Sequence, residues 1–200
     1  MRQIQRTRLA ARAAVVIVAA AGLSACDVVV NSVHGGREQA QQTWTRTYTL
    51  AGADAAVVNV NGTFDVEAVD GNTLEVKAVL VARGATEEDA KKTLAKVEMA
   101  EEADASRVRL QAKYPRELGR HGIEVNYTIR APHSARVDIE SVNGRVKVTG
   151  VFAGLKAETT NGSVNGDGLG NTVVATTTNG EIKVRMASMG GDGVTLETTN

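Results

Sequence analysis

The C-terminal third of the chain repeats one short alternation of apolar and polar residues four times. The copies read VDIESVNG, LKAETTNG, VVATTTNG and VTLETTN, and they end at Asn143-Gly144, Asn161-Gly162, Asn179-Gly180 and Asn200. In each copy the residues six and four positions before the asparagine are aliphatic, and the residue two positions before it is serine or threonine. Strands that are packed on one face show this alternation. The segment therefore predicts β-strands with one buried and one solvated face.

The spacing of the four asparagines indicates how these strands are arranged. Successive copies are 18, 18 and 21 residues apart, and a second alternating run follows each Asn-Gly pair. Each repeat is therefore predicted to contain two short strands joined at Asn-Gly, followed by a glycine-containing return. An earlier segment, AAVVNVNGTFDV, fits the same frame around Asn61-Gly62. A fixed period of this kind is typical of stacked structural units.

Two all-β architectures satisfy this repeat. Asn-Gly is a strong signal for a tight hairpin turn because both residues tolerate positive φ, and this favours stacked antiparallel β-hairpins. The pair can instead mark the corner of a β-solenoid or β-helix-like stack with about 18 residues per coil. In that stack the asparagines would lie on the inward face and form a ladder of hydrogen-bonded amides. Three matching consecutive copies favour the solenoid.

One helix is predicted to interrupt the strands. Thr86 precedes three acidic residues, which predicts an N-cap and an acidic first turn. Ala90, Leu94 and Val97 then recur at helical spacing. We expect an amphipathic helix over about residues 87–99 that covers one face or end of a sheet.

These patterns define a β-repeat domain over residues 43–200, with a helical insertion at 86–100 and regular repeats at 137–200. Each earlier copy of the repeat continues from asparagine into glycine and a second strand, whereas the last copy stops at Asn200. We therefore expect the repeats to continue beyond residue 200, with glycine as the next residue.

The N-terminus predicts export and lipid anchoring. A basic segment precedes an apolar run of 11 residues, Ala13 to Leu23, which suits a signal peptide and is too short to span a bilayer. The run ends in Leu23-Ser24-Ala25-Cys26, which resembles a bacterial lipobox, and Cys26 is the only cysteine. We expect residues 1–25 to be a lipoprotein signal peptide, Cys26 to be lipidated, and residues 26–42 to form a flexible tether.

Charge excludes nucleic acid as a partner. The whole chain has 23 basic and 23 acidic residues, but the predicted signal peptide holds four arginines and no acid. Without these arginines 19 basic residues remain against 23 acidic ones, a net charge of about −4. Such a mildly acidic body has no basic field for nucleic acid. The predicted partners are a membrane, reached through the N-terminal lipid, and an envelope protein or polysaccharide.

The sequence contains no recognisable catalytic or metal-binding motif. The three histidines, His34, His121 and His133, have no metal-ligand spacing, and there is no nucleophile elbow. Segments such as Asn165-Gly166-Asp167-Gly168 are similar to the turns of calcium-binding β-rolls, but the corresponding loop of the first repeat has no carboxylate. We predict no metal, no cofactor and no catalytic residue.

Two glutamates on the predicted solvated face, Glu140 and Glu158, are the best candidates for acid–base chemistry. They are 18 residues apart, and adjacent carboxylates on stacked strands could act on a polysaccharide. Thr176 interrupts the row, and Lys156 and Arg145 are placed to neutralise it. A solvated face is therefore the preferred interpretation.

Several segments together resemble a known family. TEEDAKKTLAKVEM, LQAKYP, IEVNYTIRAPHSARVDIESVNGRVKVTG and the following TTNG units are similar to the bacterial putative-adhesin β-repeat family, the domain-of-unknown-function-4097 family. The resemblance covers about residues 44–200. It implies a β-solenoid-like envelope protein, often lipid- or membrane-anchored, and it implies no reaction and no catalytic residues.

The sequence thus predicts a non-enzymatic, lipid-anchored cell-envelope protein that serves as an adhesin or as a structural and interaction module. It would lie on the outer side of the cytoplasmic membrane or in the outer membrane, facing the periplasm. An accessory role in envelope-stress sensing or regulation is the second hypothesis, and a polysaccharide-active enzyme is the third.

Overall fold

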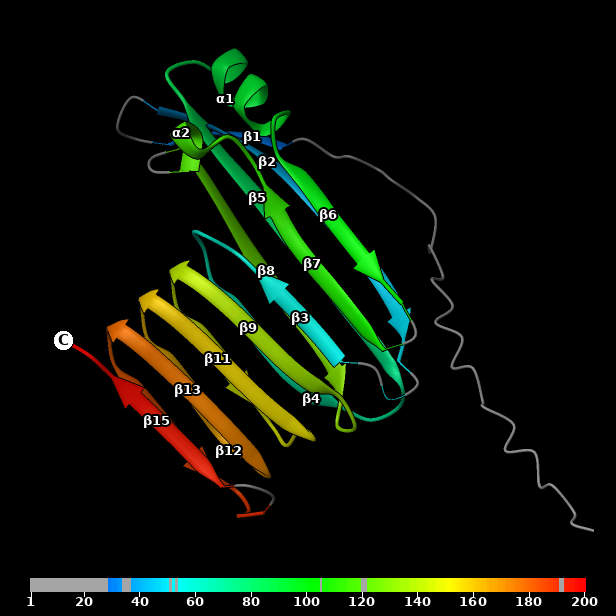
Figure 1. The fold of residues 1–200 in the computed structure, drawn as a ribbon. Helices are drawn as coiled ribbons and strands as arrows, with labels where there is room; N and C mark the ends of the chain where they lie inside the picture. The colour runs from blue at the N-terminus through cyan, green and yellow to red at the C-terminus, as the bar shows by residue number, and fades with distance from the viewer. Residues whose placement is uncertain are drawn as a thin grey trace, which may run out of the picture.

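A computed structural model describes residues 29–33, 37–50, 52, 54–104, 106–119, 122–190 and 193–200. Within these residues the fold is all-β, with two sheets and two short helices (Figure 1). Sheet A contains eight strands: β1 (Val29–Val33), β2 (Arg37–Thr49), β4 (Phe64–Val69), β5 (Thr73–Gly84), β8 (Ile123–Pro132), β10 (Val146–Thr149), β12 (Val164–Leu169) and β14 (Ile182–Met186). Sheet B contains seven strands: β3 (Asp54–Val58), β6 (Glu98–Ala103), β7 (Arg107–Lys113), β9 (Arg136–Asn143), β11 (Gly154–Asn161), β13 (Thr172–Asn179) and β15 (Val194–Thr198).

The repeats form parallel strands in strict register. Leu155 of β11 lies opposite Val137 of β9 and Val173 of β13, so equivalent residues of successive repeats are neighbours. Each Asn-Gly pair connects a strand of sheet B to a strand of sheet A, as β9 to β10 and β11 to β12. The antiparallel hairpin alternative is therefore wrong for the repeats, because Asn-Gly joins two sheets instead of turning within one.

The parallel stack also includes segments from earlier in the chain. In sheet B, β3 pairs with β9 so that Val57 lies opposite Ile139, and in sheet A β4 pairs with β10 so that Phe64 lies opposite Val146. Asn61 bridges to Asn143, so the frame predicted around Asn61-Gly62 is part of the stack. Strands β7 and β8 pair in parallel with β3 and β4 on the side away from β9 and β10.

Antiparallel strands complete the end of the stack that lies beyond β7 and β8. In sheet A, β5 pairs with β8, β2 with β5 and β1 with β2, and in sheet B β6 pairs with β7. Both sheets are thus open and mixed, with sheet orders β1-β2-β5-β8-β4-β10-β12-β14 and β15-β13-β11-β9-β3-β7-β6. The description of the whole domain as a β-solenoid stays a prediction.

The helix α1 (Glu87–Leu94) packs against β5 and β2, at the end of the molecule opposite β15 (Figure 1). The Thr86 side chain accepts a hydrogen bond from the backbone N–H of Asp89, and Ala90 and Leu94 enter the core. The predicted helix over 87–99 is too long, because the chain enters β6 at Glu98. Residues 98–103 pair with β7 through backbone hydrogen bonds. Val97, in the segment that connects α1 to β6, packs against the core.

The predicted tether over residues 26–42 also needs correction. Residues 29–33 form β1 and residues 37–42 begin β2, and these segments pair with each other in an antiparallel manner. The polar composition of this segment suggested a tether, but backbone pairing does not require apolar side chains on both faces of an outer strand. The second helix, α2 (Arg116–Gly119), lies in the connection between β7 and β8.

The core is a layer of aliphatic and small side chains between the two sheets. Rows such as Val137–Leu155–Val173 and Ile139–Ala157–Ala175 run along the stack at the strand spacing and are buried. Phe64 and Tyr127, which are register partners in sheet A, stack with ring centroids 5.0 Å apart and an interplanar angle of 9°. Burial of such rows is the main favourable contribution to the stability of the domain.

The backbones of successive repeats approach most closely at the Asn-Gly corners. The N–H of Gly62 donates to Asn143 O, Gly144 to Asn161 O and Gly162 to Asn179 O, each at 3.1 Å. A Cβ atom at Gly144, Gly162 or Gly180 would overlap the carbonyl oxygen of the preceding corner glycine. Glycine is therefore required here by the close approach of two backbones.

The first prediction follows from this close approach. Gly162→Ala should lower the free energy of unfolding by about 1–3 kcal/mol, because the added methyl group forces two corners apart. Urea denaturation followed by circular dichroism measures the effect. Gly154→Ala is the matched control, since a Cβ there meets only Arg136 Cγ and Cδ, at 3.5 and 3.9 Å. Equal stability of both variants would contradict the role given to the corners.

Candidate functional site on the outer face of sheet B

The asparagines of the Asn-Gly pairs form the predicted ladder of side-chain amides along the corners. Asn143 Nδ2 donates to Asn61 Oδ1 at 2.8 Å, Asn161 Nδ2 to Asn143 Oδ1 at 2.9 Å, and Asn179 Nδ2 to Asn161 Oδ1 at 2.9 Å. Asn143, Asn161 and Asn179 are exposed, so the expectation that they face inward is wrong. Each stands at the end of a strand, where the chain leaves sheet B, and alternation no longer directs its side chain into the core.

A row of buried polar residues lies two positions before these asparagines. Ser141, Thr159 and Thr177 are at most 8% exposed, and Thr177 Oγ1 donates to the carbonyl of Gly162 at 3.0 Å. Asn59 takes the equivalent place before Asn61, and its Nδ2 donates to Val125 O at 2.8 Å and to Asn61 O at 3.0 Å. The corner residues thus fasten one repeat to the next and join sheet B to sheet A.

The other predicted site residues, Leu23, Ser24, Ala25 and Cys26, lie outside the described residues. The same holds for His34 and His121. His133 is described, and its Nδ1 lies 2.6 Å from the carbonyl oxygen of Val151 in a neighbouring turn.

The two glutamates considered for catalysis occupy one outward-facing row of sheet B. Glu140 and Glu158 are register partners, and Thr176 follows Glu158 in the same row. Lys156 Nζ lies 2.9 Å from Glu158 Oε2, so a cation neutralises one of the two carboxylates, as expected from the sequence. The hydrogen bond to Glu158 is the main cause that raises the pKa of Lys156, and the carboxylates of Asp138 and Glu140 add to it.

The glycine-rich segment considered for calcium, residues 165–168, lies within strand β12 instead of forming a turn, and its carboxylate is held in an ion pair. Arg185 donates to both oxygens of Asp167, with distances of 2.6 and 2.7 Å, on the outer face of sheet A. This pair holds the pKa of Asp167 below its usual value. Within the described part of the chain, three or more His, Cys, Asp or Glu residues do not come together as a metal site would need. Nor do those residues include a helix long and apolar enough to cross a membrane.

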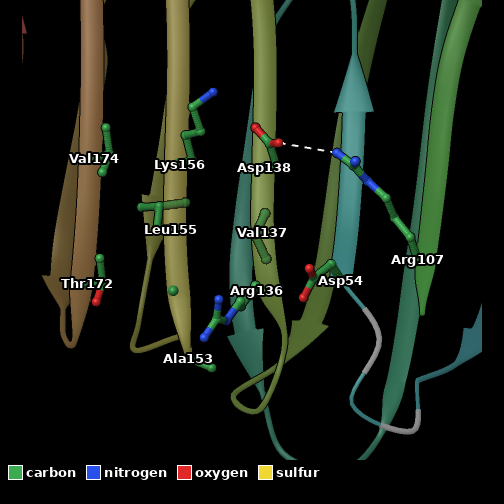
Figure 2. A pocket seen from close by; sticks show the side chains of 11 residues that line it. Asp54, Arg107, Arg136, Val137, Asp138, Ala153, Leu155, Lys156, Thr172 and Val174 are labelled. Carbon is green, nitrogen blue, oxygen red and sulfur yellow. Dashed lines mark hydrogen bonds and ion pairs between the residues drawn. The ribbon is translucent and has the colours of Figure 1, made fainter. Parts of the chain in front are cut away.

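A cleft of about 330 Å³ opens on the outer face of sheet B, and the sequence patterns did not predict it. It lies over the N-terminal ends of β9, β11 and β13, with Arg136, Gly154 and Thr172 in one register row (Figure 2). These three residues occupy the same place in successive 18-residue repeats. A comparison of outward-facing positions across the repeats would have revealed a glycine between two larger residues.

Charged side chains from four strands surround this cleft. Arg107 of β7 extends past β3 to Asp138 of β9, with Nη2 and Oδ2 3.3 Å apart (Figure 2). Asp54 of β3 lies between Arg107 and Arg136, and Lys156 of β11 stands on the opposite side of the cleft. The arrangement offers both cations and hydrogen-bond acceptors to a polar ligand.

Comparisons with known proteins find weak similarity to solved structures. One is described as a putative cell adhesion protein from Clostridium sporogenes ATCC 15579, with 9% identity, a TM-score of 0.37, and coverage of 79% of this chain and 99% of that one. A putative adhesin from Parabacteroides distasonis ATCC 8503 has 10% identity, a TM-score of 0.29, and coverage of 78% and 77%. A putative lipid binding protein from the same organism has 9% identity, a TM-score of 0.26, and coverage of 78% and 96%. With identities and TM-scores this low, these similarities assign neither function nor family.

No protein-family model and no curated protein matches the sequence. The resemblance to the adhesin β-repeat family therefore stays a prediction from the quoted segments.

The amide ladder generates the second prediction. Asn161→Ala removes two side-chain hydrogen bonds at once and should lower the free energy of unfolding by about 1 kcal/mol, since both lost partners can still bind water. Thr160→Ala is the control, because Thr160 is the neighbouring exposed residue, and its effect should stay within about 0.5 kcal/mol. Thermal unfolding of both variants distinguishes them, and a smaller loss for Asn161→Ala than for Thr160→Ala would contradict a stabilising ladder.

Proposed function

We propose that this protein is a non-enzymatic, lipid-anchored protein of the bacterial cell envelope, and that its β-repeat domain is an adhesin-like interaction module. The observation that carries the proposal is the parallel in-register stack. Stacking places equivalent side chains of successive repeats beside one another, so each outer face carries rows of polar groups at a spacing of about 4.8 Å. An extended partner with a regular repeat can contact several members of one row.

The lipobox-like segment Leu23-Ser24-Ala25-Cys26 supports the anchor. Lipidation at Cys26 would attach the mature chain to a membrane, since each buried methylene group contributes about 0.8 kcal/mol and two or more acyl chains anchor stably. Strand β1 begins at Val29, only a few residues after Cys26. The anchored domain would therefore stand close to the membrane surface instead of at the end of a long tether.

The repeat geometry and the sequence resemblance support the finer assignment. We interpret the parallel part of the two sheets as a β-solenoid with 18 residues per coil, in which one strand of each coil belongs to sheet B and the other to sheet A. The segments that resemble the domain-of-unknown-function-4097 family include these coils and the region of α1. Membership of that family is part of the proposal.

The third prediction tests the anchor. In cells that make the full chain, globomycin should cause an unprocessed precursor to accumulate, because it blocks the signal peptidase of lipoproteins. Cys26→Ala and Cys26→Ser should each prevent lipid attachment, which metabolic labelling with palmitate measures. Untreated wild type is the reference for both assays. Retention of label in both variants, or normal processing in the presence of globomycin, would refute lipid anchoring at Cys26.

The fourth prediction tests the absence of catalysis. Purified full-length protein should release no products from a panel of acidic polysaccharides, as measured by reducing ends and by absorbance of unsaturated sugars. The decisive variant is Glu158→Gln, with Glu140→Gln as its register partner for comparison. Turnover by the wild type that disappears in Glu158→Gln would replace the proposed function with a polysaccharide-degrading one.

A further inference from the structure

We propose that the cleft over Gly154 on the outer face of sheet B binds a carboxylate-bearing sugar of an acidic polysaccharide. The inference rests on the proposed function, and it names the chemical class of the partner and the place where it binds. It is carried by three observations: a hollow over a residue that lacks a side chain, a cation beside that hollow that pairs with no carboxylate of the described residues, and carboxylates on the wall toward β7.

The hollow is formed by Gly154. Outward-facing side chains rise on either side of it in the same register row, from Arg136 on β9 and from Thr172 on β13. A Cβ atom at Gly154 would meet only the Cγ and Cδ atoms of Arg136, at 3.5 and 3.9 Å. Neither backbone strain nor a close backbone contact therefore requires glycine at this place. Its effect on the surface is to leave room, and the cleft of about 330 Å³ lies at the small end of ligand sites, for which about 300–1,000 Å³ is typical.

Arg136 supplies the cation. Its side chain extends from β9 toward the start of β11 (Figure 2), and no carboxylate of the described residues lies within ion-pair distance of it. The two neighbouring cations are engaged, Arg107 with Asp138 at 3.3 Å and Lys156 with Glu158 at 2.9 Å. A guanidinium group is the side chain best suited to hold a planar carboxylate by two parallel hydrogen bonds. Arg136 can therefore accept one carboxylate of a ligand in the cleft.

Acidic side chains determine which anionic ligand suits the cleft. Asp54 and Asp138 line the wall toward β7, and Glu140 and Glu158 follow on the same face. Carboxylates accept hydrogen bonds from hydroxyl groups, but they repel a second dense negative charge. A uronic acid polymer carries one carboxylate per sugar and several hydroxyls. It therefore matches a cleft in which Arg136 pairs with no carboxylate of the described residues and is surrounded by hydrogen-bond acceptors. A polyphosphate chain carries more closely spaced charges and has no hydroxyl groups along the chain to donate to these carboxylates, so it would meet repulsion from the same residues.

The position of the cleft argues against an extended peptide. Peptides that add a strand to a sheet need an edge with unpaired backbone groups. Here β9 is paired on both sides, with β3 and β11, and β11 is paired with β9 and β13. Recognition must therefore use side chains, and those around Gly154 include five charged residues and Thr172, beside four apolar members of the lining, Val137, Ala153, Leu155 and Val174.

The test measures binding of an oligogalacturonate of defined length to the full-length protein in detergent by isothermal titration calorimetry. The fully methyl-esterified oligomer is the matched ligand, because it keeps the hydroxyls and lacks the charge. Arg136→Gln should weaken binding of the acidic oligomer by about tenfold or more, as expected for loss of a hydrogen-bonded charge pair. Gly154→Val fills the hollow and should abolish binding, while its thermal unfolding stays at or above that of the wild type.

Arg145→Gln is the control for a general loss of positive charge, because Arg145 is exposed and lies outside the cleft. Its affinity should equal that of the wild type. Preference for the acidic oligomer, its loss in both cleft variants and its retention in Arg145→Gln would support the inference. No binding of the acidic oligomer, or affinity unchanged in Gly154→Val or Arg136→Gln, would overturn it.

Failure of the inference and failure of the proposed function give different results. A protein that is lipidated at Cys26 and releases no sugar, but does not bind the oligomer, would overturn the cleft alone. A protein that binds the oligomer through Arg136 and also cleaves it would overturn the non-enzymatic function and leave the binding site in place.

Discussion

The stack depends on how closely two backbones can approach at the Asn-Gly corners. At Gly144, Gly162 and Gly180 a single methyl group would overlap the carbonyl oxygen of the corner before it. The corner N–H groups, the asparagine amides and the buried hydroxyl of Thr177 all donate along the stacking direction, toward the neighbouring repeat. If the corners moved apart, these bonds would lengthen together, and the strands on both sides would lose register. The corners therefore act together with the strand ladders to hold both sheets in register.

Much of the repeat region could be predicted from the sequence because one physical rule controls each position. Alternation places Leu155 and Ala157 inside, and the 18-residue period predicts that their neighbours are Val137, Ile139, Val173 and Ala175. The period also separates the two architectures left open by Asn-Gly. A ladder of asparagine amides requires parallel neighbours in register, and the amides of Asn143, Asn161 and Asn179 are in this arrangement. The prediction that the asparagines face inward was wrong, because the alternation of inward and outward side chains ends where the strand ends and these asparagines are exposed.

The remaining part of the fold could not be predicted because it depends on contacts between distant segments. Strands β7 and β8 join the stack on the side of β3 and β4 that faces away from β9, although the chain runs directly from β8 into β9. As a result β3 lies between β7 and β9, and β4 lies between β8 and β10, and no local sequence pattern encodes this order. The end of α1 and the pairing of β1 with β2 are similar cases, in which a neighbouring strand decides whether residues 98–103 and 37–42 are helix, coil or strand. The cleft was not predicted for another reason. It lies over Gly154, and a residue without a side chain gives no signal of binding in a single sequence.

The same periodicity that constrains the core leaves the outer face free to vary. Inward-facing members of each repeat must fit the layer between two sheets, so they stay apolar from one repeat to the next, as in the row Ile139, Ala157 and Ala175. Outward-facing members contact other surface side chains and water, and one row of sheet B accordingly contains Arg136, Gly154 and Thr172. A surface of this kind can acquire a binding site by substitutions at one or two positions without loss of the fold. Gly154 is such a position. The strand would tolerate a side chain there, and adding one would change only the surface above it.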